Sequence, residues 1–130
     1  MNAIKRVLIV GGGSAGLRHA INVRKILPGA QICILTNQKK VFYLGIDLFK
    51  TNSSEEAKKF KADVTIIANA ASSHIESALV FASIGSHIFI EKPISTSITD
   101  ASKLIKFCRG KGLHVAVGYN LRFSSSLNFF

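Results

Sequence analysis

The chain has 130 residues, 48% of them hydrophobic, and a formal net charge of +10. A chain of this size buries roughly two-thirds of its unfolded surface, which predicts one globular domain and excludes disorder and a two-domain enzyme. No apolar run approaches the roughly 18 residues that a membrane span needs. The first residues place glycines where a secretory signal needs an apolar region and a cleavage site. We therefore expect a cytoplasmic protein that does not associate with a membrane.

The cysteines and the excess of basic residues limit the possible ligands. Cys33 and Cys108 lie in apolar segments without a nearby Cys or His, which predicts buried free thiols and neither a disulfide nor a metal site. The 17 Lys and Arg residues against 7 Asp and Glu favour an anionic partner, such as a phosphorylated cofactor, an acidic sugar or a nucleic acid. Because the basic residues are scattered from Lys5 to Arg122, a solvated basic surface is the simpler interpretation, and nucleic-acid binding is not expected.

Short apolar runs alternate with stretches of helical periodicity along the whole chain. Strands are expected at residues 4–10, 31–35, 63–68, 87–90 and 114–117. A first helix follows the glycine cluster and stops at Pro28, and a polar helix is expected near 54–60 within an irregular stretch. Two more helices are expected to begin at caps, one with Ser73 and Glu76 and one with Ser97 and Asp100. This alternation predicts an α/β fold, a Rossmann-type doubly wound parallel sheet in a single three-layer domain.

A glycine motif lies between the first strand and the first helix. Gly11, Gly13 and Gly16 have G-x-G-x-x-G spacing, which provides a tight turn, a bare backbone that a pyrophosphate can approach and a close helix contact. The free N–H groups at the helix start, including those of Ser14 and Ala15, would face the anion. A purely structural glycine turn is the alternative. The position of the motif directly after the first strand favours dinucleotide binding.

The second strand ends without the acidic residue that would bind both ribose hydroxyls of NAD. Thr36 and Asn37 are neutral at this point, and Lys39 and Lys40 follow. A carboxylate about 4 Å from a 2′-phosphate would cost about 4 kcal/mol at an effective dielectric constant of about 20, so its absence removes the main barrier to NADP. The sequence thus places NADP slightly ahead of NAD, with Lys39 or Lys40 attracting the phosphate. The alternative is that both lysines form a solvated loop pair.

Polar residues also follow the later strands, and here a family resemblance emerges. The segments are N-A-A-S-S-H from Asn69, I-E-K-P ending at Pro93, and V-G-Y-N-L-R-F ending at Phe123. Together with G-G-G-S-A-G they resemble the amino-terminal domain of the glucose–fructose oxidoreductase, inositol dehydrogenase and MocA family over essentially the whole chain. E-K-P at this place is much more specific than the glycine motif.

The resemblance implies roles for the positions that match. The motif glycines would bind the pyrophosphate, the segment around Asn69 would lie beside the nicotinamide ribose, Lys92 would lie near the hydride-transfer centre, and Arg122 near the cofactor. Two departures, Thr36 or Asn37 for the usual acid and Ala70 for a frequent proline, leave coenzyme preference and loop shape open. The candidate cofactor-binding residues are Gly11, Gly13, Ser14, Ala15, Gly16, Thr36, Asn37, Lys39, Asn69, His74, Glu91, Lys92, Asn120 and Arg122.

Lys92 is the candidate catalytic residue. An ammonium at a strand end beside a nicotinamide would hold the reacting oxygen or stabilise developing negative charge, and Pro93 stiffens the exit from the strand. An ion pair with Glu91 or with solvent is the alternative, and the residues alone favour it. We expect His74, in a first helical turn, to be a hydrogen-bonding structural group and not the base. Asn120 is expected to be a turn residue or a cofactor contact.

The resemblance also implies a second, larger α/β domain, which in the family forms the substrate site and supplies an acid and a histidine for proton transfer. We expect residues 1–123 to form an NAD(P)-binding domain and residues 124–130 to be the truncated start of a connection to that missing domain. The expected function is that of an oxidoreductase which, in complete form, transfers hydride between nicotinamide and a sugar-like hydroxyl or keto substrate. A non-catalytic NAD(P)-binding or interaction module is the alternative, and homo-oligomerisation stays open.

Overall fold

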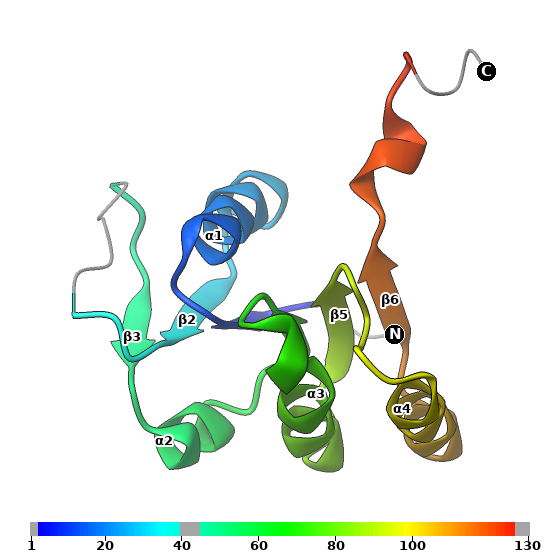
Figure 1. The fold of residues 1–130 in the computed structure, drawn as a ribbon. Coiled ribbons are helices and arrows are strands. Elements are labelled where there is room, and N and C mark those ends of the chain that lie inside the picture. Colours follow the sequence, from blue (N-terminus) through cyan, green and yellow to red (C-terminus); the bar gives the residue numbers. More distant parts are fainter. Residues whose placement is uncertain (1–2, 40–44, 127–130) are drawn as a thin grey trace.

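The computed structural model describes residues 3–39 and 45–126, which form a parallel sheet with helices packed on its faces (Figure 1). The strands are β1 (Arg6–Val10), β2 (Gln31–Leu35), β3 (Phe49–Thr51), β4 (Val64–Ile67), β5 (His87–Glu91) and β6 (Val115–Gly118). The α-helices are α1 (Ser14–Ile26), α2 (Ser54–Lys59), α3 (His74–Ser83) and α4 (Ile98–Gly110). Two single turns of 3-10 helix are η1 (Ala71–Ser73) and η2 (Asn120–Phe123).

The six strands have the order β3-β2-β1-β4-β5-β6, and every pairing is parallel. β1 therefore pairs on one side with β2, where Val7 faces Ile32, and on the other side with β4, where Val7 faces Val64. The chain first winds outward from β1 to β3 and then outward in the other direction from β4 to β6. In such sheets the ligand site lies beyond the carboxyl ends of the strands where the winding direction changes, which here is beside β1 and β4.

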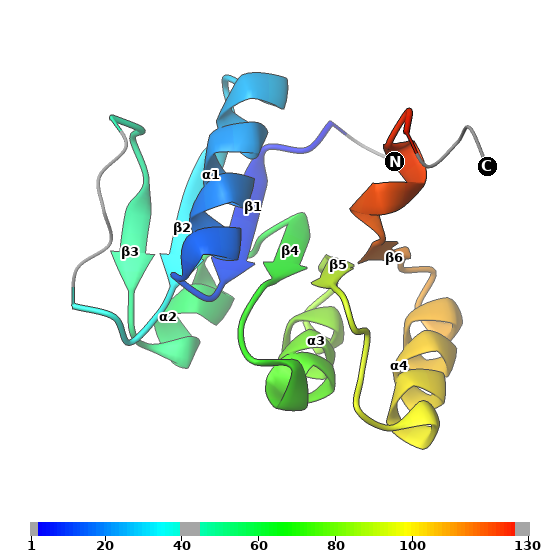
Figure 2. The same cartoon turned by 45° about the horizontal axis from the view of Figure 1, so that its top comes forward.

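Two hydrophobic cores lie on opposite faces of the sheet. The alternating side chains of β1 contribute to both, with Val7 and Ile9 on one face and Leu8 and Val10 on the other. On the first face Ala20 of α1 packs against the sheet, whereas α2, α3 and α4 all pack on the second face. Figure 2 shows α1 alone in front of β1 and β2. The fold class is the expected Rossmann-type α/β fold, with unequal cover of the two faces.

The strand and helix predictions differ from the structure in two places. β3 was not expected, because the region before α2 gives no strand signal of its own. Ser73 directly precedes α3, as predicted, but the expected capping contact is absent: its backbone, at φ −105° and ψ 1°, belongs to η1, and its side chain makes no capping hydrogen bond. The cap at Ser97 is confirmed, since its hydroxyl accepts the N–H of Asp100 at 3.3 Å.

The described part of the chain also bears on the thiols and on membrane insertion. Cys33 and Cys108 are buried and unbonded, and burial raises the pKa of both thiols, that of Cys33 to about 11. A thiol with such a pKa is almost entirely protonated at neutral pH and is a poor nucleophile. None of the helices in residues 3–39 and 45–126 combines the length and the apolar character needed to cross a bilayer.

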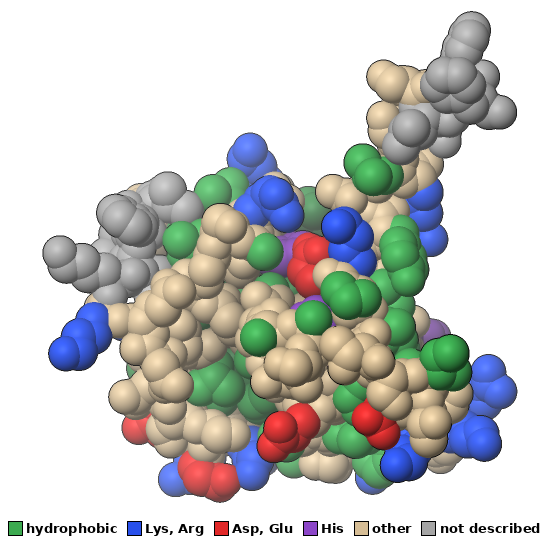
Figure 3. Space-filling model, in the orientation of Figure 1, with side chains coloured by type: hydrophobic (Ala, Val, Ile, Leu, Met, Phe, Trp, Pro, Cys, Tyr) green, Lys and Arg blue, Asp and Glu red, His purple; other side chains and the backbone are tan. Residues whose placement is uncertain are grey.

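Charged side chains are dispersed over the face of the molecule seen in Figure 3. Lys and Arg side chains lie at several separate places on this face, with Asp and Glu side chains between some of them. The expectation that the protein does not bind nucleic acid stays a prediction.

The turn η2 projects beyond the end of β6, away from the rest of the domain (Figure 1). Three large apolar residues in and next to η2 are exposed, namely Tyr119, Leu121 and Phe123.

Candidate functional site

The turn between β1 and α1 depends on glycine at two positions for its shape. Gly11 has φ +112°, and a Cβ atom there would lie 2.6 Å from the carbonyl oxygen of Ala68. A Cβ atom on Gly16 would lie 1.9 Å from the carbonyl oxygen of Gly11. These two glycines allow α1 to start close against the ends of β1 and β4. Gly13 differs from them, because a Cβ atom there would meet nothing within 4 Å.

The first turn of α1 carries amides that no side chain caps. Gly13 is the N-cap residue in an extended conformation, and the first turn contains no acidic residue. The first amide of this helix with an acceptor is that of Leu17, which donates to the carbonyl of Gly13 at 3.0 Å. Among the described residues, the amides of Ser14 and Ala15 have no hydrogen-bond acceptor. The positive end of the helix dipole and these free donors together favour an anion.

A cavity of about 730 Å³ lies over this turn, within the size range of small-molecule and cofactor sites. Its walls come mainly from the segments that follow β1, β2, β3 and β4. The sequence-predicted residues in its lining are Gly11, Gly13, Thr36, Asn37 and Asn69. The structure therefore brings together five candidates that lie on three separate loops.

Asn69 lines this cavity and has an unused acceptor. Its side-chain Nδ2 donates to Ser77 Oγ at 2.9 Å, which fixes the orientation of the amide. Its Oδ1 is buried and has no hydrogen-bond partner within the described part of the chain. A buried acceptor without a partner costs free energy, and most such atoms in folded proteins are satisfied. The side-chain oxygen Oδ1 of Asn69 thus fits a site that a hydroxyl or amide donor of a ligand would complete.

His74 joins the loops that follow β4 and β5. The ring is 2% exposed, with Nδ1 2.8 Å from the carbonyl oxygen of Pro93 and Nε2 3.0 Å from that of Asn69. Because both ring nitrogens face backbone carbonyls, neither points into the cavity as a proton acceptor. This agrees with the expected structural role. Any contribution of His74 to cofactor binding would come through the positions of Asn69 and Pro93.

At the end of β5, the structure excludes the ion pair of Lys92 with Glu91 and leaves Lys92 in contact with solvent. The Glu91 carboxylate lies 2.5 Å from His19 Nε2. Both side chains of this pair are partly buried. The Lys92 side chain is exposed, and no carboxylate of the described residues lies within salt-bridge distance of it. Lys92 is therefore not paired with Glu91 and is free to approach a ligand beyond β5.

His19 is the residue that the sequence analysis missed. It stands on α1, 72 positions from Glu91, and its ring meets Phe89 edge-on at a centroid distance of 5.4 Å. The pair lines a second cavity of about 340 Å³ between α1 and the ends of β5 and β6. Asn120 and Arg122, on η2, line this second cavity and not the cavity over the glycine turn. The contact between His19 and Glu91 has no signal in the local sequence of α1 or of β5.

The loop after β2 forms the remaining part of the candidate site. Thr36 is buried below the glycine turn, and a Cβ atom on Gly12 would lie 2.6 Å from its Oγ1. That hydroxyl accepts the N–H of Gln38 at 3.2 Å, while Asn37 and Lys39 are exposed. Lys40, the other lysine expected to attract a phosphate, lies outside the described residues.

Comparison with known proteins identifies the domain. Residues 5–119 match the family model Gfo/Idh/MocA, described as an oxidoreductase family with an NAD-binding Rossmann fold. The chain belongs to this family. The expected resemblance is thereby confirmed, and this chain is the family's NAD-binding Rossmann domain.

Curated relatives extend well beyond the region that this chain matches. The chain is 27% identical over 124 residues to scyllo-inositol 2-dehydrogenase (NAD(+)) of Bacillus subtilis, which covers 91% of this chain and 36% of that enzyme. It is 26% identical over 127 residues to 4-carboxy-2-hydroxymuconate-6-semialdehyde dehydrogenase of a Sphingobium species, covering 93% of this chain and 40% of that enzyme. The chain thus spans well under half the length of these relatives.

Solved structures of other dehydrogenases and oxidoreductases share the fold. The WlbA dehydrogenase of Bordetella pertussis, solved in complex with NADH and UDP-GlcNAcA, superposes with a TM-score of 0.86 at 20% identity, over 98% of this chain and 40% of that one. The probable oxidoreductase yhhX superposes with a TM-score of 0.87 at 21% identity, over 97% of this chain and 38% of that one. At these identities the superpositions establish the fold.

Proposed function

We propose that this chain is the coenzyme-binding part of an NAD(P)-dependent oxidoreductase that, in complete form, transfers hydride to or from a hydroxyl or keto group of a sugar-like substrate. The observation that carries the proposal is the pair of free amides at the start of α1, directly after Gly13, which lines a cavity of about 730 Å³ and leaves room for a ligand. An inositol dehydrogenase and a dehydrogenase bound to a nucleotide sugar among the related proteins support the substrate class.

The binding of the coenzyme would be divided between the glycine turn and the loop after β4. The amides of Ser14 and Ala15 would donate to the pyrophosphate, which would lie across the open side of Gly13. The buried Oδ1 of Asn69 would accept a hydrogen bond from a hydroxyl of the nicotinamide ribose. The nicotinamide, when bound, supplies or accepts the hydride.

Lys92 would act on the substrate. Its ammonium, exposed beyond the end of β5, would donate a hydrogen bond to the reacting oxygen and stabilise negative charge that develops there. The partly buried contact between His19 and Glu91 and the hydrogen bond from His74 to Pro93 hold the backbone on both sides of Lys92. Glu91 thus supports the strand end, and its carboxylate is already paired.

We propose NADP as the slightly preferred coenzyme. The residue in the place of the usual acid is Thr36, whose hydroxyl is buried and already hydrogen-bonded, so no carboxylate of this loop repels a 2′-phosphate. Lys39 is exposed in the same loop. The related structure that contains NADH does not set the preference of this chain, because its sequence is only 20% identical.

Calorimetric titration of the purified chain with NADH and NADPH tests the proposal. We expect saturable binding of at least one of them, and its loss in Gly13→Val, whose side chain would occupy the open space over the turn. Gly29→Val is a matched control. A Cβ atom on Gly29 also meets nothing within 4 Å, but Gly29 lies in the loop after α1, away from the glycine turn. Equally negligible heats with both coenzymes would refute coenzyme binding.

The alternative is a non-catalytic NAD(P)-binding or interaction module. It is favoured by the surroundings of Lys92, since the described residues place neither a carboxylate nor a free imidazole beside this ammonium to exchange a proton. A panel of inositols and nucleotide sugars, assayed by the absorbance of the reduced nicotinamide, separates the two functions. Turnover that is abolished by Lys92→Ala while NADPH binding persists supports the oxidoreductase, and binding without turnover supports the module.

We propose a cytoplasmic location on the strength of the two thiols. Cys33 and Cys108 are unbonded, and secreted domains of this size more often contain disulfides. Fractionation of the source cells would place the protein with cytoplasmic markers, and recovery from an oxidising compartment would contradict this proposal.

A further inference from the structure

Lys50, on the edge strand β3, contacts the loop that follows β2, where the ribose of the coenzyme is expected to bind. Lys50 pairs in register with Ile34 of β2, one residue before each strand ends. Its Nζ donates a hydrogen bond to the carbonyl oxygen of Lys39 at 3.0 Å. An ammonium has three N–H donors, so two remain after this contact. The carbonyl of Lys39 thereby holds a positive charge at the loop that follows β2.

The ammonium stands beside a cavity that adjoins the glycine turn. This cavity of about 420 Å³ is lined by Lys39, Lys50 and Glu56, among others. It shares Thr36, Asn37, Gln38 and Asn52 with the lining of the 730 Å³ cavity, so the two form neighbouring parts of one depression. A ligand that places a pyrophosphate on α1 and extends toward β2 would bring its outer groups to Lys50.

Thr36 adds no negative charge of its own at the end of β2. Its side chain packs under Gly12, and its hydroxyl is occupied by the N–H of Gln38. A small, inward-turned residue at the end of β2 cannot grip two ribose hydroxyls in the way that a carboxylate does. Residues other than Thr36 must then recognise the ribose of the coenzyme. Lys50 lines the same cavity as Thr36 and can take this role.

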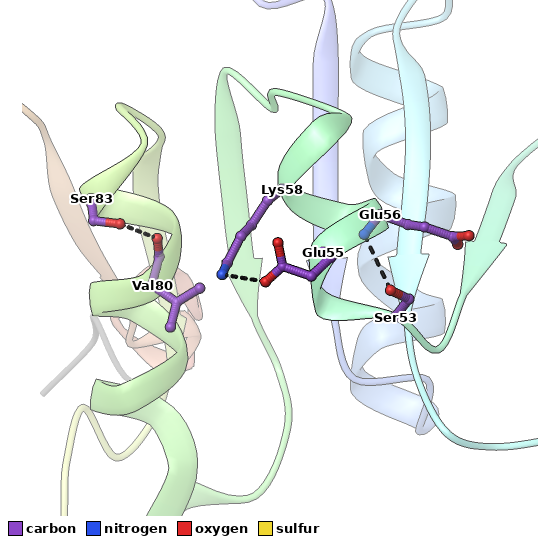
Figure 4. Close-up of polar contacts among 6 residues, drawn as sticks. All are labelled: Ser53, Glu55, Glu56, Lys58, Val80 and Ser83. Atoms are coloured by element: carbon purple, nitrogen blue, oxygen red, sulfur yellow. Dashed lines mark hydrogen bonds and ion pairs between the residues drawn. The ribbon is translucent and has the colours of Figure 1, made fainter.

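Glu56 is the opposing charge in the same cavity. Its carboxylate accepts a hydrogen bond from Thr51 Oγ1 at 2.5 Å. In Figure 4 the Glu56 side chain points away from the Glu55–Lys58 ion pair and toward the strands, while its backbone N–H donates to Ser53. A phosphate bound here would be attracted by Lys50 and repelled by Glu56, so both residues affect its affinity.

We propose that Lys50 recognises the 2′-phosphate of NADP and that Glu56 limits the affinity for it, a proposal that rests on the coenzyme-binding function above. A phosphate dianion matches a compact ammonium with two free donors, and such charge-assisted hydrogen bonds are stronger than neutral ones. Lys50 is thus the specificity-determining residue of this site, on the edge strand of the sheet.

Titration of the full chain with NADPH and NADH, in parallel, tests the proposal. Lys50→Met should weaken NADPH binding by about tenfold or more and change NADH binding by less than about twofold. Lys50→Arg should retain most of the NADPH affinity, because the positive charge persists. Glu56→Gln, which keeps an acceptor for Thr51, should strengthen NADPH binding by about threefold. Lys106→Met, an exposed lysine on α4, is the matched control and should alter neither affinity.

The outcomes separate this proposal from the proposed function. If the unmodified chain binds neither coenzyme, coenzyme binding fails and the role of Lys50 fails with it. If both coenzymes bind but Lys50→Met leaves their affinity ratio unchanged, or weakens both equally, only the role of Lys50 is refuted. Thermal unfolding of each variant without coenzyme shows whether β3 is intact, and retained NADPH binding by Lys50→Arg identifies charge as the cause.

Discussion

At the amino edge of the sheet Asp63 accepts the backbone N–H groups of Lys5 and Arg6, both at 2.8 Å, whereas at the carboxyl edge the amides of Ser14 and Ala15 have no acceptor among the described residues. Further polar groups at the amino edge also satisfy one another. The guanidinium of Arg6 donates to the carbonyl of Phe60 at 3.1 Å, and buried Thr65 and Ser86 share a hydrogen bond of 2.8 Å.

The same polar chemistry therefore has different uses at the two edges. Hydrogen bonds that close within the protein stabilise the fold, whereas donors and acceptors without a partner, such as Oδ1 of Asn69, are suited to a ligand. The comparison predicts that substitutions at the amino edge change stability without changing coenzyme binding. At the carboxyl edge, positions open to the cavity should do the reverse.

The largest effect is expected from two glycines of the same turn. Gly16→Ala should lower the free energy of unfolding by about 3 kcal/mol, because its Cβ would collide with the carbonyl of Gly11, which cannot move away without displacing β1. Gly13→Ala has open space and should cost under about 1 kcal/mol, the difference between Gly and Ala at an N-cap. Urea unfolding of both variants measures this contrast. Equal losses would mean that the turn is not packed as described.

Removal of the Asp63 carboxylate should have the next largest effect. Asp63→Ala leaves two amides of the β1 entry without their acceptor and should cost about 2 kcal/mol in urea unfolding. Coenzyme affinity, measured by calorimetry, should not change, since Asp63 stands at the opposite end of the sheet from the glycine turn. A loss of affinity in this variant would contradict the separation of the two edges.

The contribution of Asp63 should also depend on pH. Hydrogen bonds from Lys5 and Arg6 lower the pKa of this carboxyl below its ordinary value of 3.8. Because the folded-state pKa is the lower one, the stabilisation is fully present above the ordinary value and is lost as the pH falls through the lowered pKa. The difference in stability between the unmodified chain and Asp63→Ala should be constant from about pH 5 upward. A difference that grows on acidification would refute this assignment.

The smallest contrast compares two serines that precede helices. Ser97→Ala should cost about 1 kcal/mol, because the Ser97 hydroxyl caps α4. Ser73→Ala should cost less than about 0.5 kcal/mol, because that hydroxyl caps nothing. Thermal or urea unfolding resolves the difference. A cost at Ser73 equal to that at Ser97 would indicate a capping contact in solution.

Sequence patterns predicted the parts of the fold that depend on local periodicity. The five apolar runs all correspond to strands, and the glycine motif lies at the turn where it was expected. β3 was missed because a three-residue strand shows no periodicity and exists through its pairing with β2. Ser73 was misassigned because its spacing to Glu76 suits a capping box, but η1 places Ser73 inside a turn.

The candidate site was predictable to the extent that each loop carries its own signal. Glycine spacing and the neutral end of β2 are local features. The partly buried pair of His19 with Glu91 and the contact of Lys50 with the Lys39 carbonyl join segments that meet only in the folded sheet. Lys50 was also hidden because it lies on the strand that had not been predicted.

The place of β1 in the sheet has a consequence for how the molecule assembles. β2 follows β1 after a single helix, but the partner on its other side, β4, arrives only after β3 and α2 have been made. Closure of a longer segment loses more chain entropy, so pairing with β2 should precede pairing with β4. In the interval, the apolar segment Arg6–Val10 would present an unpaired edge to other chains. Refolding yield should therefore fall as protein concentration rises.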